Sequence, residues 1–172
     1  TDHLFPSLLK EISCPPIAIF CEGEQKLLRQ QMIAMVGSRK PTPAGLKIAE
    51  EMAAVLSSAG FTVVSGLAIG IDTVVHVGAL SAFGSTIGVC ATGLDRVYPK
   101  QNTELARDIV DKGVLISEFP VGTPVRKHHF PRRNRMISGL AIATVVVEAV
   151  IRSGSLITAG FAADQGREVF AV

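Results

Sequence analysis

The sequence has few cysteines, a single tyrosine and no tryptophan. It contains three cysteines in 172 residues, and eight of its nine aromatic residues are phenylalanines. Cys14, Cys21 and Cys90 have no CxxC spacing and lie in or beside apolar runs, so we expect small core residues in a reducing compartment and no metal site. A chain of this length buries a substantial core without disulfide or metal support.

Long apolar segments are also absent. No uninterrupted apolar run is long enough to cross a bilayer, and the N-terminus shows no signal-peptide pattern. We therefore expect a soluble, cytoplasmic protein with no membrane partner. The hydrophobic fraction of 48% is nevertheless high and mainly aliphatic, which favours a parallel sheet covered by helices.

From residue 32 onward, short apolar segments alternate with helical patterns. The predicted strands are 33–36, 61–64, 86–90, 114–116, 142–147 and 168–172. The predicted helices are 43–58, 72–83, 102–112, 132–139 and 155–165. This order predicts a doubly wound α/β fold, extended Rossmann-like, whose mostly parallel sheet has helices on both faces. Residues 1–31 are expected to be a lead-in packed on the 32–172 domain, with an edge strand at 17–20.

The segment MIAMVGSRKPTPAG, residues 32–45, predicts an anion site. Gly37 permits a sharp exit from the buried strand, and Ser38 and Arg39 follow before a helix that begins near Pro43. Such a loop directs free N–H groups and a helix dipole at one point, while an arginine fork matches phosphate oxygens. The alternative is an ordinary βα turn with solvated basic residues.

Two further loops follow predicted strands. The turn formed by Ser153, Gly154 and Ser155 precedes a helix and offers N–H groups to another phosphate, although neither serine has a GxSxG context or an evident base. In SGLAIGID, residues 65–72, Asp72 is expected to be a helix N-cap. His76 either packs or bonds to that carboxylate. The chain holds no GxGxxG dinucleotide fingerprint.

The stretch RKHHFPRRNRMISG, residues 126–139, is the most basic part of the chain. Residues 119–147 contain five basic and no acidic side chains, which predicts a local cationic surface. Phe130 within it suits single-stranded nucleic acid, because every base has a face to stack and every phosphate a charge. Pro131 fits a first helical position, and the Asn134 amide is expected inside, tying loops together. The alternative is a solvated basic helix with Phe130 in the core.

Taken together, the motifs resemble the DNA-processing protein A family, also called Smf. The matching segments are GSRKPTPAGLKIAEEM, SGLAIGIDTVVHVGAL, ATGLDRVYPKQN, SEFPVGTPVRKHHFPRRNRMISGL and VVEAVIRSGSLITAGFAADQGREVFAV. The resemblance implies a homodimeric, non-catalytic Rossmann-like protein without a cofactor. It also implies that the protein binds and protects single-stranded DNA and helps load the RecA recombinase in natural transformation. We expect the chain to be the central domain of a longer protein.

The resemblance also implies roles for individual residues. Arg39 grips phosphate with the backbone of Gly37 and Ser38, Lys127 adds charge and Phe130 lies by a base. Arg133 and Asn134 shape the pocket as much as they touch DNA. The sequence departs from the family at Ala91 and Val75, which bears on loop shape rather than charge.

Two other functions are weighed against DNA binding. A Rossmann-like nucleotide-binding or nucleotide-hydrolysing enzyme is the first, with Asp72 and Glu118 as its acids. The related phosphoribohydrolases carry a PGGxGT pattern, and no PGG occurs here. The second is a protein-interaction platform, with the apolar segments 140–151 and 156–163 as a dimer face.

Overall fold

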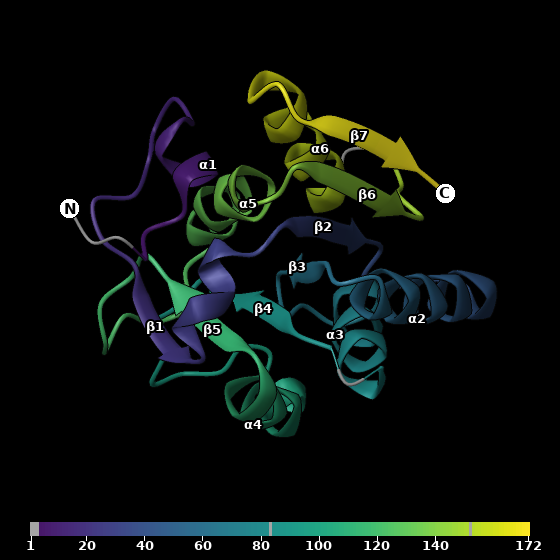
Figure 1. Ribbon diagram of the computed structural model, residues 1–172, viewed down its shortest axis with the longest axis horizontal. Coiled ribbons are helices and arrows are strands. Elements are labelled where there is room, and N and C mark those ends of the chain that lie inside the picture. Colours follow the sequence, from purple (N-terminus) through teal and green to yellow (C-terminus); the bar gives the residue numbers. More distant parts are fainter. Residues whose placement is uncertain (1–3, 83, 152) are drawn as a thin grey trace.

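The structure is a computed structural model that describes residues 4–82, 84–151 and 153–172 (Figure 1). The strands are β1 (Phe20–Gly23), β2 (Met32–Gly37), β3 (Thr62–Ser65), β4 (Thr86–Val89), β5 (Val114–Ser117), β6 (Ala143–Val147) and β7 (Glu168–Ala171). The helices are α1 (Ser7–Lys10), α2 (Pro43–Ser58), α3 (Ile71–Ser81), α4 (Thr103–Lys112), α5 (His129–Leu140) and α6 (Gly154–Asp164), with the 3-10 turns η1 (Gln25–Arg29) and η2 (Lys100–Asn102).

The described strands form one sheet with the order β1-β5-β4-β3-β2-β6-β7. Strands β2 to β7 pair in parallel, and β1 is antiparallel to β5. Side chains alternate between the two faces, so Ala34 of β2 packs with α1 and α5 while Met35 packs with α2 and α3. Helix α4 covers the same face as α3 through Ile109. The predicted doubly wound, mostly parallel fold is confirmed.

The order of the strands places a topological switch point beside β2. The chain runs outward from β2 through β3 and β4 to β5, and then α5 crosses the opposite face to reach β6 on the other side of β2. The loops after β2 and β6 therefore diverge to opposite faces. Open α/β sheets bind ligands at such a point, outside the carboxyl ends of the strands.

Helix α2 spans the residues that the sequence predicts. Thr42 is its N-cap, whose Oγ1 accepts a hydrogen bond from the Gly45 N–H at 3.1 Å, and Pro43 occupies the first helical position. Glu148 accepts a hydrogen bond from the Thr42 N–H at 2.8 Å and another from the Thr42 hydroxyl. These bonds tie the start of α2 to the end of β6 and lower the pKa of Glu148.

Several local predictions are wrong. The edge strand lies at Phe20–Gly23 and not at 17–20, because its register is set by pairing with β5, and Ile17 is fully exposed. Helix α5 begins at His129, two residues before Pro131, which sits within the first turn where its missing N–H costs nothing. Cys90 is buried, as expected, but Cys14 is exposed.

The lead-in packs against the sheet. Leu9 and Ile12 belong to the same buried cluster as Met136 of α5. Phe83, at the predicted end of the helix 72–83, and Arg152, before the predicted serine turn, lie outside the described residues, as do residues 1–3. Within the described ranges, none of the helices combines the length and the apolar character that a membrane span requires.

Candidate functional site

Two adjoining cavities lie at the carboxyl ends of the central strands. The first, called here the serine cavity, has a volume of about 470 Å³. It is lined by the loop after β2, the start of α3, the middle of α5 and the start of α6; its residues include Gly37, Ser38, Arg39, Asp72, Arg133, Asn134, Ser153, Gly154 and Ser155. The second, called here the aromatic cavity, measures about 710 Å³ and is lined by Arg39, Gly66, Tyr98, Lys100, Gln101, Phe130 and Arg133 among others. Arg39 and Arg133 border both.

The loop after β2 is shaped by close backbone packing. A Cβ on Gly37 would meet the carbonyl oxygen of Val147 and lie 2.7 Å from the Cγ1 atom of Ile71. The Ile71 N–H donates to the Ser38 carbonyl oxygen at 3.1 Å, and the Lys40 N–H donates to the Ser38 hydroxyl at 3.1 Å. The loop is thus held against the start of α3, and the Arg39 side chain is left exposed at the mouth of both cavities.

The start of α6 closes the serine cavity with hydrogen-bond donors. Ser153 is the N-cap, whose hydroxyl accepts from the Leu156 N–H at 3.4 Å and lies 2.8 Å from the Ser155 hydroxyl. The first N–H groups of a helix have no intrahelical acceptor, and those of Gly154 and Ser155 donate to no acceptor among the described residues, which leaves them available to an anion. The helix dipole also favours negative charge at this point.

Arg133 is buried between the two cavities, with only 4% of its surface exposed. Its guanidinium donates to the carbonyl oxygens of Gly66 and Val89, the latter at 2.7 Å, and its Nε donates to Asn134 Oδ1 at 3.1 Å. Asn134 Nδ2 in turn donates to the Gly154 carbonyl oxygen at 3.2 Å. These bonds join the loop after β3, the last residue of β4 and the first residue of α6, so the expectation that the Asn134 amide lies inside and ties neighbouring segments together is confirmed.

The predicted N-cap role of Asp72 is wrong. Gly70, at φ 85°, turns the chain one step earlier, so α3 begins at Ile71 and Asp72 lies inside its first turn. The Asp72 carboxylate accepts from the Ala68 N–H at 3.3 Å. Burial raises the pKa of Asp72, against the lowering effect of the Arg133 charge.

His76 does not bond to that carboxylate, because its ring packs against Thr86 at the start of β4. It is fully buried, its Nδ1 lies 2.7 Å from the Thr86 hydroxyl, and burial lowers its pKa to about 3. This outcome is the packed alternative of the two that the sequence left open.

Phe130 and Tyr98 form the aromatic part of the second cavity. Their ring centroids lie 5.8 Å apart with the rings tilted by 58°. The Cζ atoms of Arg39 and Arg133 lie 5.6 and 6.0 Å from the Phe130 centroid, so guanidinium groups cover part of this ring. Phe130 is partly buried rather than a core residue, and Tyr98 is 50% exposed.

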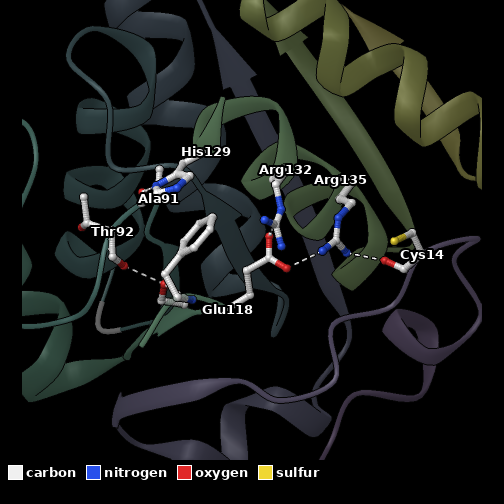
Figure 2. Close-up of polar contacts among 9 residues, drawn as sticks. Cys14, Ala91, Thr92, Glu118, His129, Arg132 and Arg135 are labelled. Atoms are coloured by element: carbon white, nitrogen blue, oxygen red, sulfur yellow. Dashed lines mark hydrogen bonds and ion pairs between the residues drawn. The ribbon is translucent and has the colours of Figure 1, made fainter. Parts of the chain in front are cut away.

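The cationic surface formed by residues 119–147 is smaller than the number of basic residues in this stretch predicts. Glu118, one residue before the acid-free stretch, pairs with both Arg132 and Arg135, and Arg135 also donates to the Cys14 carbonyl oxygen (Figure 2). The side chains of Glu118 and Arg135 are buried in this cluster, and the side chain of Arg133 is buried between the two cavities. Lys127 remains exposed but lines neither cavity, so it is the one predicted site residue that the structure does not bring into them.

Several polar residues at the site were not singled out from the sequence: Lys100 and Gln101 line the aromatic cavity, and Asn102 follows them. Asn102 is buried, and its Nδ2 donates to the Leu67 carbonyl oxygen at 2.9 Å and lies 3.0 Å from the Thr73 hydroxyl. It fastens η2, one wall of the aromatic cavity, to the loop before α3. No local pattern distinguishes such a buried amide from a solvated one at the start of a helix.

The family model for DNA recombination-mediator protein A matches residues 1–172. Over 169 residues, the chain is 44% identical to the DNA processing protein DprA of Bacillus subtilis, covering 98% of this chain and 57% of that protein. It is 43% identical over 171 residues to Protein Smf of Escherichia coli, with 99% and 46% covered. The chain therefore spans about half the length of these curated relatives.

Solved structures agree with this assignment. The X-ray structure of DNA processing protein A from Streptococcus pneumoniae matches with a TM-score of 0.95 at 44% identity, over 99% of this chain and 60% of that one. The DNA processing protein A of Helicobacter pylori, solved for its single-stranded DNA binding mode, matches with a TM-score of 0.92 at 29% identity, over 97% and 77%. The molybdenum cofactor binding protein of Rippkaea orientalis, at 18% identity and a TM-score of 0.62, shares the fold alone. By sequence and by structure, the chain belongs to the DNA recombination-mediator protein A family.

Proposed function

We propose that this domain binds single-stranded DNA along the carboxyl edge of its sheet and carries out no reaction on it. The observation that carries the proposal is the convergence of Arg39, the free N–H groups at the start of α6 and the Phe130 ring on two adjoining cavities. A phosphate needs the first two features, and a base needs the third.

In this proposal Arg39 and the N–H groups of Gly154 and Ser155 hold backbone phosphate, with Gly37 and Ser38 letting the strand approach the main chain. Phe130 contacts a base. Arg133 and Asn134 shape the site, since their polar groups are already used within the protein. Lys127, outside the cavities, attracts the strand at longer range.

Support also comes from the relative in Helicobacter pylori, whose structure concerns the binding of single-stranded DNA. That structure matches 97% of this chain with a TM-score of 0.92. The DNA-processing names of the curated relatives agree with the same substrate class.

We propose binding rather than nucleotide hydrolysis because both acids available for catalysis are engaged. Asp72 accepts a backbone hydrogen bond and faces Arg133, and Glu118 is paired with two arginines away from the cavities. A general base needs a free carboxylate aimed at the proton that it removes.

Family membership extends the proposal to the whole protein. We propose that it acts in the cytoplasm as a homodimer that protects incoming single strands and helps load RecA on them during transformation.

The test is a fluorescence-anisotropy titration of a labelled oligo-dT against the wild-type protein, R39A and R107A, over a range of salt concentrations. Arg107 is the matched control, since it is an exposed arginine on α4 that pairs with Glu104 and lines neither cavity. We expect R39A to bind more weakly and to lower the salt slope by about 0.7, the value of one phosphate contact on a single strand.

R107A is expected to match the wild type in both affinity and slope. Equal binding by R39A and R107A would contradict the proposed site. Binding by the wild type without salt dependence would contradict a phosphate contact altogether.

A further inference from the structure

The serine cavity lies between two loops that leave neighbouring strands and then diverge. Gly37, the last residue of β2, pairs with Val147, the last residue of β6. Beyond this pair, one loop carries Ser38 and Arg39 toward α2, and the other leads to Ser153 at the start of α6; residues of both loops line the cavity. A phosphate that is held from both loops is bound tightly only if the distance between the loops is fixed.

Glu148 connects these two loops from outside the cavity. Its backbone begins the loop after β6, and its carboxylate reaches the end of the loop after β2. There it accepts a hydrogen bond from the Thr42 N–H at 2.8 Å and another from the Thr42 hydroxyl. Neither residue lines the serine cavity, so this connection acts on a bound phosphate only through the position of the loops.

The backbone and the surroundings of Glu148 are adapted to this contact. Glu148 has a φ of 51°, in the left-handed region that few residues other than glycine adopt. Gly45, in the first turn of α2, leaves room for the carboxylate, because a Cβ at this position would come within 2.4 Å of the Glu148 carboxyl group. An unfavourable backbone conformation persists where the surrounding structure holds it, and such residues gather at functional sites.

The charge of Glu148 does not itself favour the binding of DNA. The hydrogen bonds from Thr42 hold the pKa of Glu148 below its ordinary 4.5, so the carboxylate is ionised at neutral pH. A negative charge beside a phosphate site repels the phosphate. Any contribution of this side chain to phosphate binding therefore has to come from the geometry that it imposes.

We propose that Glu148 is a positioning residue of the DNA site, whose carboxylate ties Thr42 to the end of β6 and so sets the distance between Arg39 and the N–H groups at the start of α6. This role rests on the proposed binding of single-stranded DNA. Glu148 touches no DNA in this proposal. The affinity for DNA thus depends on the length of an acidic side chain that makes no contact with the ligand.

Two substitutions at Glu148 separate length from charge. E148D keeps the charge and tolerates a positive φ, but its side chain is one methylene too short to reach Thr42. E148Q keeps the length, and its amide oxygen still accepts from the Thr42 N–H. By fluorescence anisotropy, E148D is expected to bind oligo-dT about 2- to 30-fold more weakly than the wild type and also more weakly than E148Q. An effect of charge alone would leave E148D equal to the wild type.

A substitution on α2 tests the same contact without changing Glu148. The new Cβ in G45A displaces the carboxylate and changes no charge, and alanine favours a helix more than glycine does. G45A is therefore expected to lose affinity for oligo-dT over the same range as E148D. The matched control is E11D, since Glu11 also joins distant segments, through Arg167 at 3.2 Å, but lines neither cavity. E11D is expected to bind oligo-dT as the wild type does.

The double variant R39A/E148D distinguishes positioning from a general loss of stability. If Glu148 acts by placing Arg39, the loss caused by E148D shrinks to less than about 2-fold when Arg39 is absent. A merely structural role would give the same loss in the presence and in the absence of Arg39. Thermal melts of all variants, followed by circular dichroism, establish that each protein is folded at the temperature of the titration.

The outcomes separate the role of Glu148 from the function on which it rests. If E148D and G45A bind oligo-dT as tightly as the wild type while R39A binds weakly, the positioning role is refuted and the proposed function stands. Equal losses in E148D and E11D would also refute the positioning role. If the wild type binds no oligo-dT, both proposals are refuted. G45A decides the question if E148D fails to fold.

Discussion

Arg133 is the residue whose replacement is expected to destabilise the domain most clearly. Its guanidinium is 4% exposed and satisfies the Gly66 and Val89 carbonyl oxygens, and it opposes the charge of Asp72, which is 7% exposed. R133M keeps the length of the side chain but leaves a buried carboxylate without its cation. Removing one partner of a buried charged pair costs about 3–5 kcal/mol.

The measurement is urea unfolding followed by far-ultraviolet circular dichroism, together with a thermal melt. For a domain of this size, the expected loss lowers the melting temperature by about 6–20 °C. The double variant R133M/D72N is the control, since it removes the buried charge and keeps the shape. It is expected to recover about 1–3 kcal/mol relative to R133M.

The destabilisation caused by R133M is expected to depend on pH, because it acts through the Asp72 carboxyl group. Burial raises the pKa of Asp72 above its ordinary 3.8, and loss of Arg133 raises this pKa further. A raised folded-state pKa favours folding when the group is protonated, so this stabilisation is present in acid and is lost as the pH rises through the folded pKa. The deficit of R133M relative to R133M/D72N is therefore largest at neutral pH. A loss below about 1 kcal/mol, or a deficit that does not change with pH, would refute the reasoning.

Two further predictions concern buried positions away from the charge pair. Burial lowers the pKa of His76 from 6.5 to about 3, so the wild type is expected to lose stability as the pH falls from 6.5 toward 3, and H76Q to flatten this slope in pH-dependent urea unfolding; parallel curves would contradict it. G37A is expected to lower the free energy of unfolding by about 1–3 kcal/mol, because the new Cβ meets the Val147 carbonyl oxygen and the Ile71 side chain. A Cβ added at Gly160 would meet no neighbouring segment within 4 Å. The control G160A is therefore expected to raise the free energy of unfolding by about 0.5–1 kcal/mol in the same assay.

The fold was predictable from the sequence where a local signal and the burial pattern agree. Thr42 and Pro43 mark the start of α2, and the strand-helix alternation after residue 32 is enough to specify the doubly wound sheet. The sequence pattern places the start of α3 one residue too late. Gly70 precedes the helix with a positive φ, and the local residue pattern does not predict that conformation. The position of β1 was missed because pairing with β5, rather than its own pattern, sets it.

The site was predictable as a set of loops but not in its charges. Residues after β2 and before α6 converge because parallel strands end at one edge. The pairing of Glu118 with two arginines depends on the return of α5 across the sheet, so counting charges along the sequence overestimated the cationic surface. The amide of Asn102 takes its role from loops far away in the sequence, which no spacing rule reveals.

Ultraviolet crosslinking of the wild-type protein to oligo-dT, with the adducts located by mass spectrometry, tests the central claim most directly. The chain carries its own controls, since Phe20 and Phe170 are 40% and 54% exposed on other elements, β1 and β7. We predict adducts on peptides that contain Phe130 or Tyr98, at the aromatic cavity. Adducts confined to the peptides of Phe20 or Phe170 would contradict the account.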